Sequence, residues 1–349
     1  MKPVPARLEP FFVPRIWGTR SLAPLFPEKI GLPEPIGEVW LTGDDCCFTS
    51  GPFAGRKLGE AWRAMPAEWK GRRAQSEHSI PLLVKFIFPE DKLSVQVHPD
   101  DDYACRHEAA AGGRGKTEMW YAMAAREGAE VMVGMKREVT PDAFRRAIAE
   151  GTAEECLERV PLKAGDVIFV PAGTAHTIGP GLVLCEIQQN SDLTYRVFDY
   201  NRLTPEGKPR QLHIQQALDV MRFGEQLGGK MAPVRIARGP VAETYYVACR
   251  YFATEKWEFD CHVAGCTSPE SFELLIILSG TGTLEAAAVS ADYSAGQVWF
   301  LPAALGTYLL RAASPSAMLR TYVPDLTEYS RRLAERRVSE ADLKRLVSQ

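Results

Sequence analysis

AGDVIFVPAGTAH (residues 164–176) and AGQVWFLPAALGT (residues 295–307) are two versions of one segment, and they decide the fold of this chain. They align without gaps, and both contain the pattern Gly-x-Val-x-Phe-x-Pro-Ala. A segment that recurs at a distance in one chain indicates two copies of a structural unit. Because the segment reads as a short apolar strand that ends in a proline turn, the repeat predicts two copies of one β fold.

The region upstream of the repeat extends the alignment. Residues 117–120 (TEMW) align with residues 272–275 (FELL) at a larger offset, and the difference is about the length of the segment 140–160. That segment begins with Thr140-Pro141-Asp142, a capping residue followed by proline at the first helical position. The first copy is therefore expected to carry a short helical insertion at about 140–160, with its helix over 140–158.

The rest of the chain also favours β structure. Its 28 glycines and 25 prolines separate short apolar or alternating runs, which is typical of an all-β sandwich or barrel. The expected strands are 82–89, 93–99, 118–125, 130–135, 166–171, 182–189, 194–200, 244–253, 272–279, 283–288, 297–302, 307–312 and 317–323. Helices are expected over 212–222 and from 327 onward, where Ser339 and Asp342 are spaced like a capping box. The many arginines of this tail are expected to form a solvated face.

Composition and charge limit the classes of function. The 349 residues are 46% hydrophobic and 24% charged, which predicts a globular chain of about two domains with a substantial core. The net charge is −3 and both signs are spread along the chain, which argues against a nucleic-acid partner. No apolar run reaches the roughly 18 residues of a membrane-spanning helix, and prolines interrupt the start, so we expect a cytoplasmic protein without a membrane partner.

The sequence gives no sign of disulfides, of a reactive cysteine or of a phosphate-binding loop. The eight cysteines are irregularly spaced and lie mostly in apolar segments, so they are expected to be reduced. Cys185 has no basic neighbour in sequence and is interpreted as a buried, inert thiol. The sequence contains no glycine-rich phosphate loop, which argues against nucleotide chemistry.

The segment LSVQVHP (93–99) carries the first candidate ligands. Its alternation places Ser94, Gln96 and His98 on one face of a strand. The same parity places Lys116 and Glu118 on one face of the next segment.

His176, which follows the turn after the repeated strand, completes the set. An amide oxygen, two imidazoles and a carboxylate suit a divalent metal of borderline softness, with room for water or substrate. Zinc fits best, although ligand type alone leaves iron, manganese, cobalt and nickel open. The candidate metal ligands are Gln96, His98, Glu118 and His176.

Each of these residues also has a structural interpretation. His98 could cap a strand end and Glu118 could pair with Lys116 at the surface, but their joint placement in one copy favours a metal site. Thr307 replaces His176 in the second copy, so only the first copy is expected to hold a metal. The other histidines are expected to be structural or exposed, namely His78, His107, His213 and His262.

Two basic residues in apolar segments point to an anionic ligand. Lys85 lies among Leu, Val, Phe and Ile, and Arg196 lies in the run TYRVFDY. An unpaired cation is costly to bury, so Lys85 is expected to face a cavity or an anion. A guanidinium among aromatic residues suits a phosphate or a developing oxyanion. The alternative for Arg196 is a buried ion pair with Asp192, Asp199 or Glu186.

Six long segments together resemble a known family. They are PRIWGTRSL (14–22), IGEVWLTG (36–43), LSVQVHPDD (93–101), GKTEMWY (115–121), VPAGTAHTIGPGLVLCEIQQNSDLTYRVFDYNR (170–202) and QLHIQQALDV (211–220). They are similar to the type I mannose-6-phosphate isomerases (phosphomannose isomerases) in their short bacterial form, over most of residues 10–325. The single insertion helix and the tail after about residue 325 depart from the longer relatives.

The resemblance implies a fold and an activity. It implies a bicupin of two double-stranded β-helix jelly-roll barrels with a few short helices. The domains would be a metal-binding cupin over 1–230, a metal-free cupin over 231–325 and a helical tail over 326–349. It implies one Zn²⁺ per chain on the four candidate ligands and the interconversion of mannose 6-phosphate and fructose 6-phosphate by a monomer or homodimer.

The resemblance also implies roles for residues in the pocket. Arg196 matches the family's catalytic arginine, and Ser94, Lys85 and Lys116 match polar residues that line the substrate pocket. An aldose–ketose isomerase moves a proton between C2 and C1 through an enediol, so zinc and Arg196 would stabilise the oxyanion. Lys85 and Ser94 would hold the phosphate, and Lys116 would be an anion contact or a proton-handling residue. Glu186 is the candidate base.

Two other functions stay open at this point. Two histidines and one glutamate also form the facial triad of a non-haem iron oxygenase, although the fourth ligand Gln96 and the basic pocket argue against it. A sugar-phosphate-binding cupin without catalysis is the other alternative.

Overall fold

The structure is a computed structural model that describes residues 1–204, 206–287 and 289–348. Its strands form four sheets, which confirms the mainly β fold. The eight-stranded sheet has the order β15 (Val234–Arg238), β16 (Val241–Ala248), β17 (Ala253–Phe259), β24 (Ser316–Tyr322), β19 (Glu273–Ser279), β22 (Val298–Leu301), β1 (Ala6–Glu9) and β4 (Cys47–Phe48). The four-stranded sheet has the order β18 (His262–Cys266), β23 (Thr307–Ala312), β20 (Thr281–Ala286) and β21 (Val289–Ser294).

The other two sheets come mainly from the first half of the chain. The seven-stranded sheet has the order β14 (Gly229–Lys230), β10 (Val167–Val170), β7 (Glu118–Ala125), β12 (Leu182–Gln189), β5 (Leu82–Ile87), β3 (Ile36–Trp40) and β2 (Phe11–Thr19). The five-stranded sheet has the order β13 (Tyr195–Phe198), β6 (Val95–Val97), β11 (His176–Ile178), β8 (Glu130–Met135) and β9 (Leu157–Pro161). The helices are α1 (Leu58–Ala64), α2 (Ala67–Lys70), α3 (Asp101–His107), α4 (Pro141–Glu150), α5 (Ile214–Val220), α6 (Leu326–Glu335) and α7 (Glu340–Leu346), with 3-10 turns at Ala109–Ala111, Ala153–Cys156 and Ala303–Leu305.

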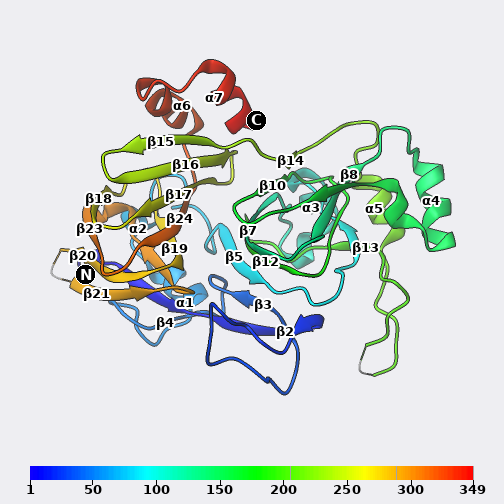
Figure 1. Cartoon of the computed structure of the whole chain (residues 1–349), viewed down its shortest axis with the longest axis horizontal. Coiled ribbons are helices and arrows are strands. Elements are labelled where there is room, and N and C mark those ends of the chain that lie inside the picture. The colour runs from blue at the N-terminus through cyan, green and yellow to red at the C-terminus, as the bar shows by residue number, and fades with distance from the viewer. Residues whose placement is uncertain (205, 288, 349) are drawn as a thin grey trace.

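The four sheets form two pairs, each around its own apolar core. The seven- and five-stranded sheets, here called the N-terminal sheet pair, enclose a core that includes Trp120 and Val131. The eight- and four-stranded sheets, the C-terminal sheet pair, enclose a core that includes Leu275 and Leu310. The C-terminal sheet pair lies on the left of Figure 1 and the N-terminal sheet pair on the right.

The two large sheets pack against each other through their remaining faces. They form a third apolar core, to which Met119 of β7 and Leu274 of β19 belong. The next residue of each strand, Trp120 or Leu275, points to the other face and into the core of its own sheet pair. Helix α1 closes one side of the third core, where Trp62 packs edge-on against Phe272 at 5.4 Å between ring centroids. The two sheet pairs are therefore joined by a continuous apolar layer.

Strand pairing confirms the internal repeat and its upstream extension. In the first copy Val170 pairs with Glu118, and in the second copy Leu301 pairs with Glu273. The offset between residues 117–120 and 272–275 is therefore the correct structural alignment. Equivalent positions in the two copies can be read from this register.

The N-terminus differs from the expected domain organisation. Leu8 of β1 pairs with Val298 of β22 and with Phe48 of β4, so both strands extend the sheet of the C-terminal half. Leu8 and Phe48 are buried there, and their backbone satisfies an edge of β22 that would otherwise be open. The start of the expected domain 1–230 is thus built into the other sheet pair.

The insertion helix is shorter than expected. Thr140 caps α4 by accepting from the Ala143 amide, and Pro141 is its first residue, as the sequence predicts. The helix ends at Glu150 because Gly151 adopts a left-handed conformation with φ 77°. A 3-10 turn and strand β9 occupy the remainder of the expected helix.

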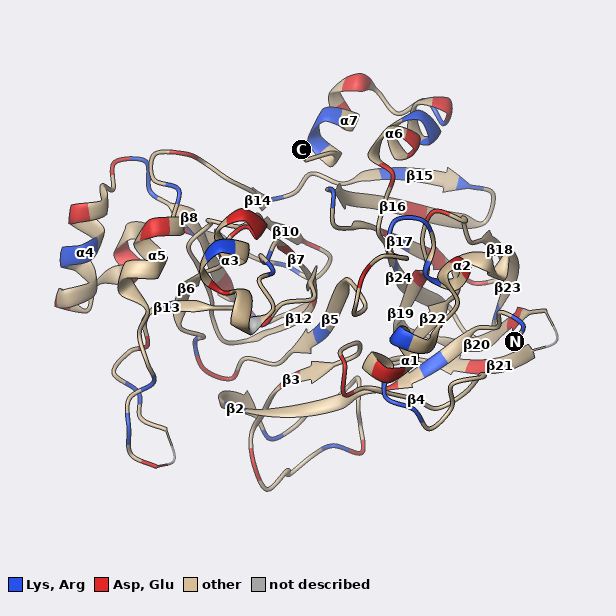
Figure 2. Ribbon diagram, turned by 180° about the vertical axis from the view of Figure 1, so that it is seen from behind, with Lys and Arg blue, Asp and Glu red and all other residues tan. Residues whose placement is uncertain are grey.

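The tail forms two helices that pack on β16 and β17 through Tyr329, Leu333 and Leu346. Ser339 caps α7 by accepting from the Asp342 amide, as expected. Both helices carry acidic and basic residues, and in α7 the acidic residues lie at its start and the basic residues at its end (Figure 2). Some tail arginines are less solvated than expected, because Arg332 and Arg336 form ion pairs with buried glutamates. No helix in the described part of the chain has the length and apolar character needed to cross a membrane.

Candidate active site and metal centre

Three neighbouring strands of the five-stranded sheet place three polar side chains in one row. Gln96 of β6 pairs with Arg196 of β13 on one side and with His176 of β11 on the other. Paired residues of adjacent antiparallel strands share a face of the sheet, so these side chains point inward together. Val95 and Val97 point to the outer face, where they pack in the core beneath α4 and α5.

The facing seven-stranded sheet supplies carboxylates and a lysine. Glu118 begins β7, and two residues later Trp120 pairs with Glu186 of β12, which in turn pairs with Lys85 of β5. Lys116 lies two residues before the start of β7. All four charged side chains are buried, with Lys85 only 2% exposed. Lys85 lines the cavity between the sheets, in agreement with the expectation that it faces a cavity or an anion.

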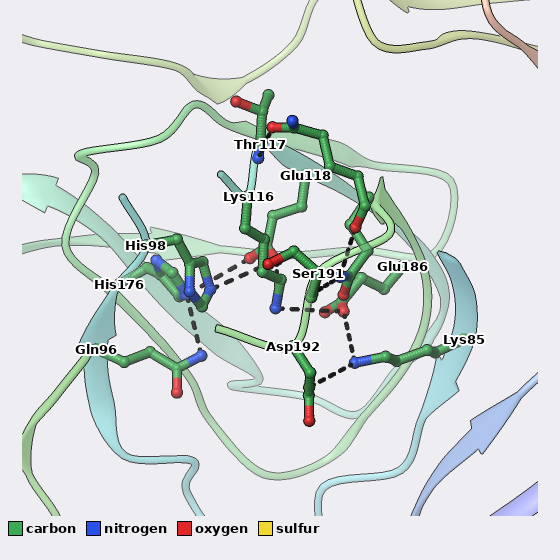
Figure 3. A network of polar contacts seen from close by, with 12 residues as sticks. Lys85, Gln96, His98, Lys116, Thr117, Glu118, His176, Glu186, Ser191 and Asp192 are labelled. Atoms are coloured by element: carbon green, nitrogen blue, oxygen red, sulfur yellow. Dashed lines mark hydrogen bonds and ion pairs between the residues drawn. The ribbon is translucent and has the colours of Figure 1, made fainter. Parts of the chain in front are cut away.

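His98, Glu118 and His176 lie at the centre of the site (Figure 3). His98 Nδ1 donates to the Leu193 carbonyl oxygen at 2.8 Å, and His176 Nδ1 donates to the Thr174 carbonyl oxygen at 2.9 Å. Because a carbonyl oxygen can only accept, each neutral ring keeps Nε2 as an acceptor. The two Nε2 atoms lie 3.6 and 3.5 Å from the Glu118 carboxylate oxygens.

Four acceptor atoms thus converge with no proton between them. His98 Nε2 and both Glu118 oxygens are buried and have no hydrogen-bond partner among the described residues. Buried acceptors that face one another are unfavourable unless a cation lies among them. The Lys116 ammonium lies 3.0 Å from Glu118 Oε2 and the Gln96 amide nitrogen lies 3.2 Å from His176 Nε2, but neither of them reaches His98 Nε2. Two imidazole nitrogens and a carboxylate within 4.8 Å of one another fit a divalent metal.

Burial controls the protonation of this cluster. It lowers the pKa of His176 to about 4 and that of His98 well below its usual value, and the charge of Lys116 lowers both further. Burial alone would lower the pKa of Lys116 as well, but the carboxylates of Glu118 and Glu186 reverse this effect and raise it above its usual value. At neutral pH the site therefore contains two neutral imidazoles and a charged ammonium.

The metal-free chain should lose stability as the pH falls from about 7 to about 5. The pKa of His176 in the folded chain, about 4, lies below the roughly 6.5 of histidine in an unfolded chain. Between these values the unfolded chain binds a proton that the folded chain does not, so the free energy of unfolding decreases as the pH decreases. Urea unfolding of chelator-treated protein measures this change, and His176→Asn should show a smaller one. Equal changes in both proteins would contradict the prediction.

A cavity of about 400 Å³ opens beside the cluster, between the two sheets. This volume is in the range of small-molecule sites. Five cations and three carboxylates line it, which favours an anionic ligand. These residues are Arg15, Lys85, Lys116, Arg196 and Arg210, with Glu38, Glu186 and Asp192.

Lys85 faces the anions that its apolar strand predicts. Its Nζ lies 3.7 Å from Glu38 and 3.6 Å from both Glu186 and Asp192. Burial raises the pKa of Glu38, but the charges of Lys85 and Arg15 outweigh this effect and lower it to about 2. Much of the positive charge of Lys85 is therefore balanced within the protein.

Arg196 is held by neutral groups. Its Nε donates to Ser94 Oγ at 3.2 Å and its Nη1 donates to the Gln211 carbonyl oxygen at 3.2 Å. Asp199, considered above as a partner, instead binds Arg210. Within the described residues no carboxylate pairs with Arg196, so the ion-pair alternative is wrong. Burial and the nearby Arg210 lower its pKa, which indicates an excess of positive charge at this wall of the cavity.

Glu186 lines the cavity, a direction that strand parity alone could not decide. It lies 3.6 Å from Lys85 and 3.9 Å from Lys116. Burial and the neighbouring Glu118 raise the pKa of Glu186, and the two lysines oppose that rise. A carboxylate with a raised pKa is suited to accept and return a proton.

Sequence reasoning missed part of the cavity wall. Glu38 is a carboxylate in an apolar strand, the same signal that pointed to Lys85, and Arg15 binds it at 3.0 Å. Arg210 lies in a loop and had no such signal. Elsewhere, His262 is exposed and Cys185 is fully buried, with its pKa raised by burial. All eight cysteine thiols are free in the structure.

The equivalent position in the C-terminal sheet pair is filled by an internal salt bridge. Glu273 occupies the repeat position of the β7 carboxylate. By strand register Arg320 stands where the first copy has Glu186, and Glu255 stands where it has Lys85. Arg320 donates through Nε to Glu273 at 2.8 Å and through Nη1 to Glu255 at 2.6 Å. These carboxylates therefore have a guanidinium partner of their own.

Arg320→Met should destabilise the protein by about 3–5 kcal/mol, because it leaves Glu255 and Glu273 buried without their cation. Chemical denaturation of wild type and variant measures the change. Arg311→Met is the matched control, since Arg311 pairs with Glu285 on the surface and should cost less than about 1 kcal/mol. Similar losses in both variants would contradict the importance of this internal salt bridge.

Comparisons with known proteins agree with the geometry. Residues 242–315 match the model of the mannose-6-phosphate isomerase cupin domain. A probable mannose-6-phosphate isomerase, GmuF, from Bacillus subtilis (strain 168) is 35% identical over 310 residues, which are 88% of this chain and 96% of the relative. The mannose-6-phosphate isomerase of Streptococcus mutans serotype c is 36% identical over 276 residues, which are 77% of this chain and 83% of the relative.

Solved structures share the whole architecture. The mannose 6-phosphate isomerase of Bacillus subtilis matches with a TM-score of 0.81 and 29% identity, covering 91% of this chain and 99% of that one. A zinc-bound mannose 6-phosphate isomerase shares the fold with a TM-score of 0.69 and 17% identity, covering 91% and 99%. The predicted family is confirmed: this chain belongs to the type I mannose-6-phosphate isomerases of the cupin superfamily and is an isomerase.

Proposed function

We propose that the protein interconverts mannose 6-phosphate and fructose 6-phosphate through an enediol and that it depends on zinc. The observation that carries this proposal is the convergence of His98, Glu118 and His176 beside a cavity with excess positive charge. Relatives similar over most of their length bear the name of this isomerase.

One Zn²⁺ per chain would be held by His98 Nε2, His176 Nε2, Glu118 and Gln96. The Gln96 amide nitrogen lies 3.2 Å from His176 Nε2, and its oxygen accepts from Ser94 Oγ at 3.3 Å. Turning the amide over would present its oxygen to the cluster and leave its nitrogen to donate to Ser94. Bound zinc with an open coordination position would orient and polarise the sugar oxygens.

Glu186 would act as the base. Its carboxylate takes the proton from C2 of the open-chain mannose phosphate and returns it to C1, while the proton of the C2 hydroxyl passes to the C1 oxygen, and the two transfers together give the ketose. The raised pKa of this buried carboxylate brings it closer to neutrality, where both transfers are favourable. Lys116, 3.9 Å away, would stabilise the anion or handle a second proton.

Arg196 would neutralise the negative oxygen of the enediolate. Its planar fork is already oriented by Ser94 and Gln211, so little reorganisation is needed. Ser94 and Lys85 would contact the substrate as well. Both would hold the phosphate, and the charge that Lys85 brings to this contact is shared with three carboxylates. Phosphate binding would fix the reacting carbons relative to the base.

The same proposal includes the domain organisation. Each sheet pair would be one jelly-roll barrel of a bicupin, with a metal-binding domain over 1–230, a metal-free domain over 231–325 and the helical tail over 326–349, and strands β1 and β4 of the first domain would complete the barrel of the second. The Arg320 salt bridge supports a metal-free second domain. The enzyme would act in the cytoplasm on a small sugar phosphate, as a monomer or homodimer, without a nucleic-acid partner.

A coupled assay of fructose 6-phosphate formation tests the function. Conversion should stop when the protein is chelated and return when zinc is added. Saturable binding of mannose 6-phosphate without conversion by the metal-replete protein would overturn the proposal in favour of a binding cupin. Oxygen uptake by the iron-loaded protein, without isomerisation, would overturn it in favour of an oxygenase.

A further inference from the structure

Asp101, the first residue of α3, joins the two sheet pairs next to the active site. Its Oδ1 accepts from the Gly115 amide and from Gln189 Nε2, both at 2.9 Å. Its Oδ2 accepts from Arg250 Nη2 at 2.7 Å and from the Tyr251 hydroxyl at 2.6 Å. One carboxylate oxygen therefore holds the N-terminal sheet pair, and the other holds the turn between β16 and β17 of the C-terminal sheet pair.

Gln189 carries this contact to the central carboxylate of the site. Its side-chain Oε1 accepts from the Thr117 backbone amide at 2.8 Å, and its backbone amide donates to the Thr117 carbonyl oxygen at 3.1 Å. Thr117 lies between Lys116 and Glu118 in the chain, and Figure 3 shows the three together beside the imidazoles. The side-chain amide of Gln189, which binds Asp101, thus also fixes the backbone between Lys116 and Glu118.

Gly115 keeps this connection short. A Cβ at Gly115 would lie 2.5 Å from the Asp100 carbonyl carbon and from the Asp101 amide nitrogen, so only glycine allows the two backbones to approach. The Lys116 amide donates to the Pro99 carbonyl oxygen at 3.0 Å in the same place. A displacement of Asp101 would therefore shift the start of β7.

The turn of the C-terminal sheet pair is a firm anchor. The Cys249 amide donates to the Phe252 carbonyl oxygen at 2.8 Å, and Phe252 packs against Phe169 at 6.3 Å in the core between the sheet pairs. Arg250 lies over the Tyr251 ring at 4.6 Å. The turn is thus fixed from behind while its two polar side chains reach Asp101.

We propose that Asp101 and Tyr251 are positioning residues for the active site, through which the C-terminal sheet pair holds Glu118 and Lys116 opposite the imidazoles. They touch neither the cluster nor the cavity and act only through Gln189 and the backbone at Thr117. The effect on turnover depends on the proposed isomerase function, whereas the effect on zinc affinity does not.

Tyr251→Phe tests the proposal because it removes one hydroxyl and no ring. Tyr246→Phe is the matched control, since Tyr246 packs against Tyr121 at 5.7 Å in the same layer between the sheet pairs. Tyr251→Phe should weaken zinc binding, measured by chelator competition, roughly threefold to tenfold and lower kcat by a similar factor. Its KM for mannose 6-phosphate should stay within about twofold, and Tyr246→Phe should change zinc affinity and kcat by less than about twofold.

A double-mutant cycle with Asp101→Asn separates positioning from simple docking of the sheet pairs. The asparagine oxygen can still accept from Gly115 and Gln189, while its amide nitrogen no longer accepts from Tyr251. In this background Tyr251→Phe should have almost no further effect on zinc affinity. Equal zinc affinity and kcat in the Tyr251→Phe and Tyr246→Phe variants, or full additivity in the cycle, would overturn the proposal. Weaker zinc binding by Tyr251→Phe in a protein whose wild type shows no isomerisation would support positioning and refute only the proposed function.

Discussion

Arg196→Ala should lower kcat for mannose 6-phosphate by about 10²- to 10³-fold while zinc content stays at the wild-type level. The guanidinium lines the cavity and is held by Ser94 and Gln211, without contact to the imidazole and carboxylate cluster. Among the described residues it forms no ion pair with a carboxylate. Its loss should therefore remove stabilisation of the developing oxyanion and leave the proposed metal ligands in place. Steady-state kinetics together with elemental analysis measure both quantities.

Two variants make the Arg196 result specific. Arg196→Lys keeps the charge without the planar fork and should recover only part of the lost kcat. Arg202→Ala removes a neighbouring guanidinium that is already paired with Asp199 at 2.6 Å and Asp91 at 3.1 Å, and it should keep kcat within about threefold. If Arg196→Ala also stays within about threefold of wild type, the assigned role is wrong.

His176→Ala should weaken zinc binding at least about 100-fold and abolish turnover at limiting zinc. Loss of a residue that only hydrogen-bonds to a metal ligand typically weakens binding by about 10- to 100-fold, and loss of a ligand itself should cost more. His176 is buried with its Nδ1 fixed by the Thr174 carbonyl, so its Nε2 is held in one orientation. The alanine variant would leave Gln96, Glu118 and a single imidazole, that of His98, as the remaining proposed ligands. Chelator competition and the coupled assay measure the two losses.

His262→Ala is the control for this prediction, since His262 is exposed on β18. It should bind zinc and turn over as wild type does. Zinc should also raise the melting temperature of wild type and of His262→Ala, but not that of His176→Ala, because a ligand stabilises only the state that binds it. Wild-type zinc affinity in His176→Ala would exclude His176 as a ligand.

Local pattern was sufficient to predict much of this site. The repeat predicted two copies of one fold, and the register of Val170 with Glu118 and of Leu301 with Glu273 confirms it. Alternation along β6 predicted that Gln96 would point away from the core that buries Val95 and Val97. Both predictions depend on the period of a strand, which a sequence shows directly.

Other features depend on pairings between distant residues. In the second copy Glu255 replaces Lys85 and Arg320 replaces Glu186, and this correspondence can be found only from the strand register of the two copies. Strand β1 pairs with a strand almost 300 residues later, and no local pattern specifies its partner. The contact of Asp101 with Tyr251 likewise spans 150 residues. Such contacts follow from how the two sheet pairs pack, which the sequence does not state.

The end of α4 is a different case. The helix ends at Glu150 because Gly151 has a φ of 77°. The expected helix over 140–158 extended past this glycine, since Phe144, Ile148 and Leu157 are apolar within an otherwise charged segment. In the structure that continuation is the apolar side of a 3-10 turn and of β9. The backbone preference of one residue was therefore a better guide than the spacing of side chains.

A zinc titration of the metal-free protein, followed by fructose 6-phosphate formation, tests the central claim most directly. Four acceptor atoms from two facing sheets converge beside the cavity, and the account predicts that turnover rises linearly with zinc and stops rising at one zinc per chain. Turnover that is independent of zinc, or tight binding of one zinc without any turnover, would contradict it.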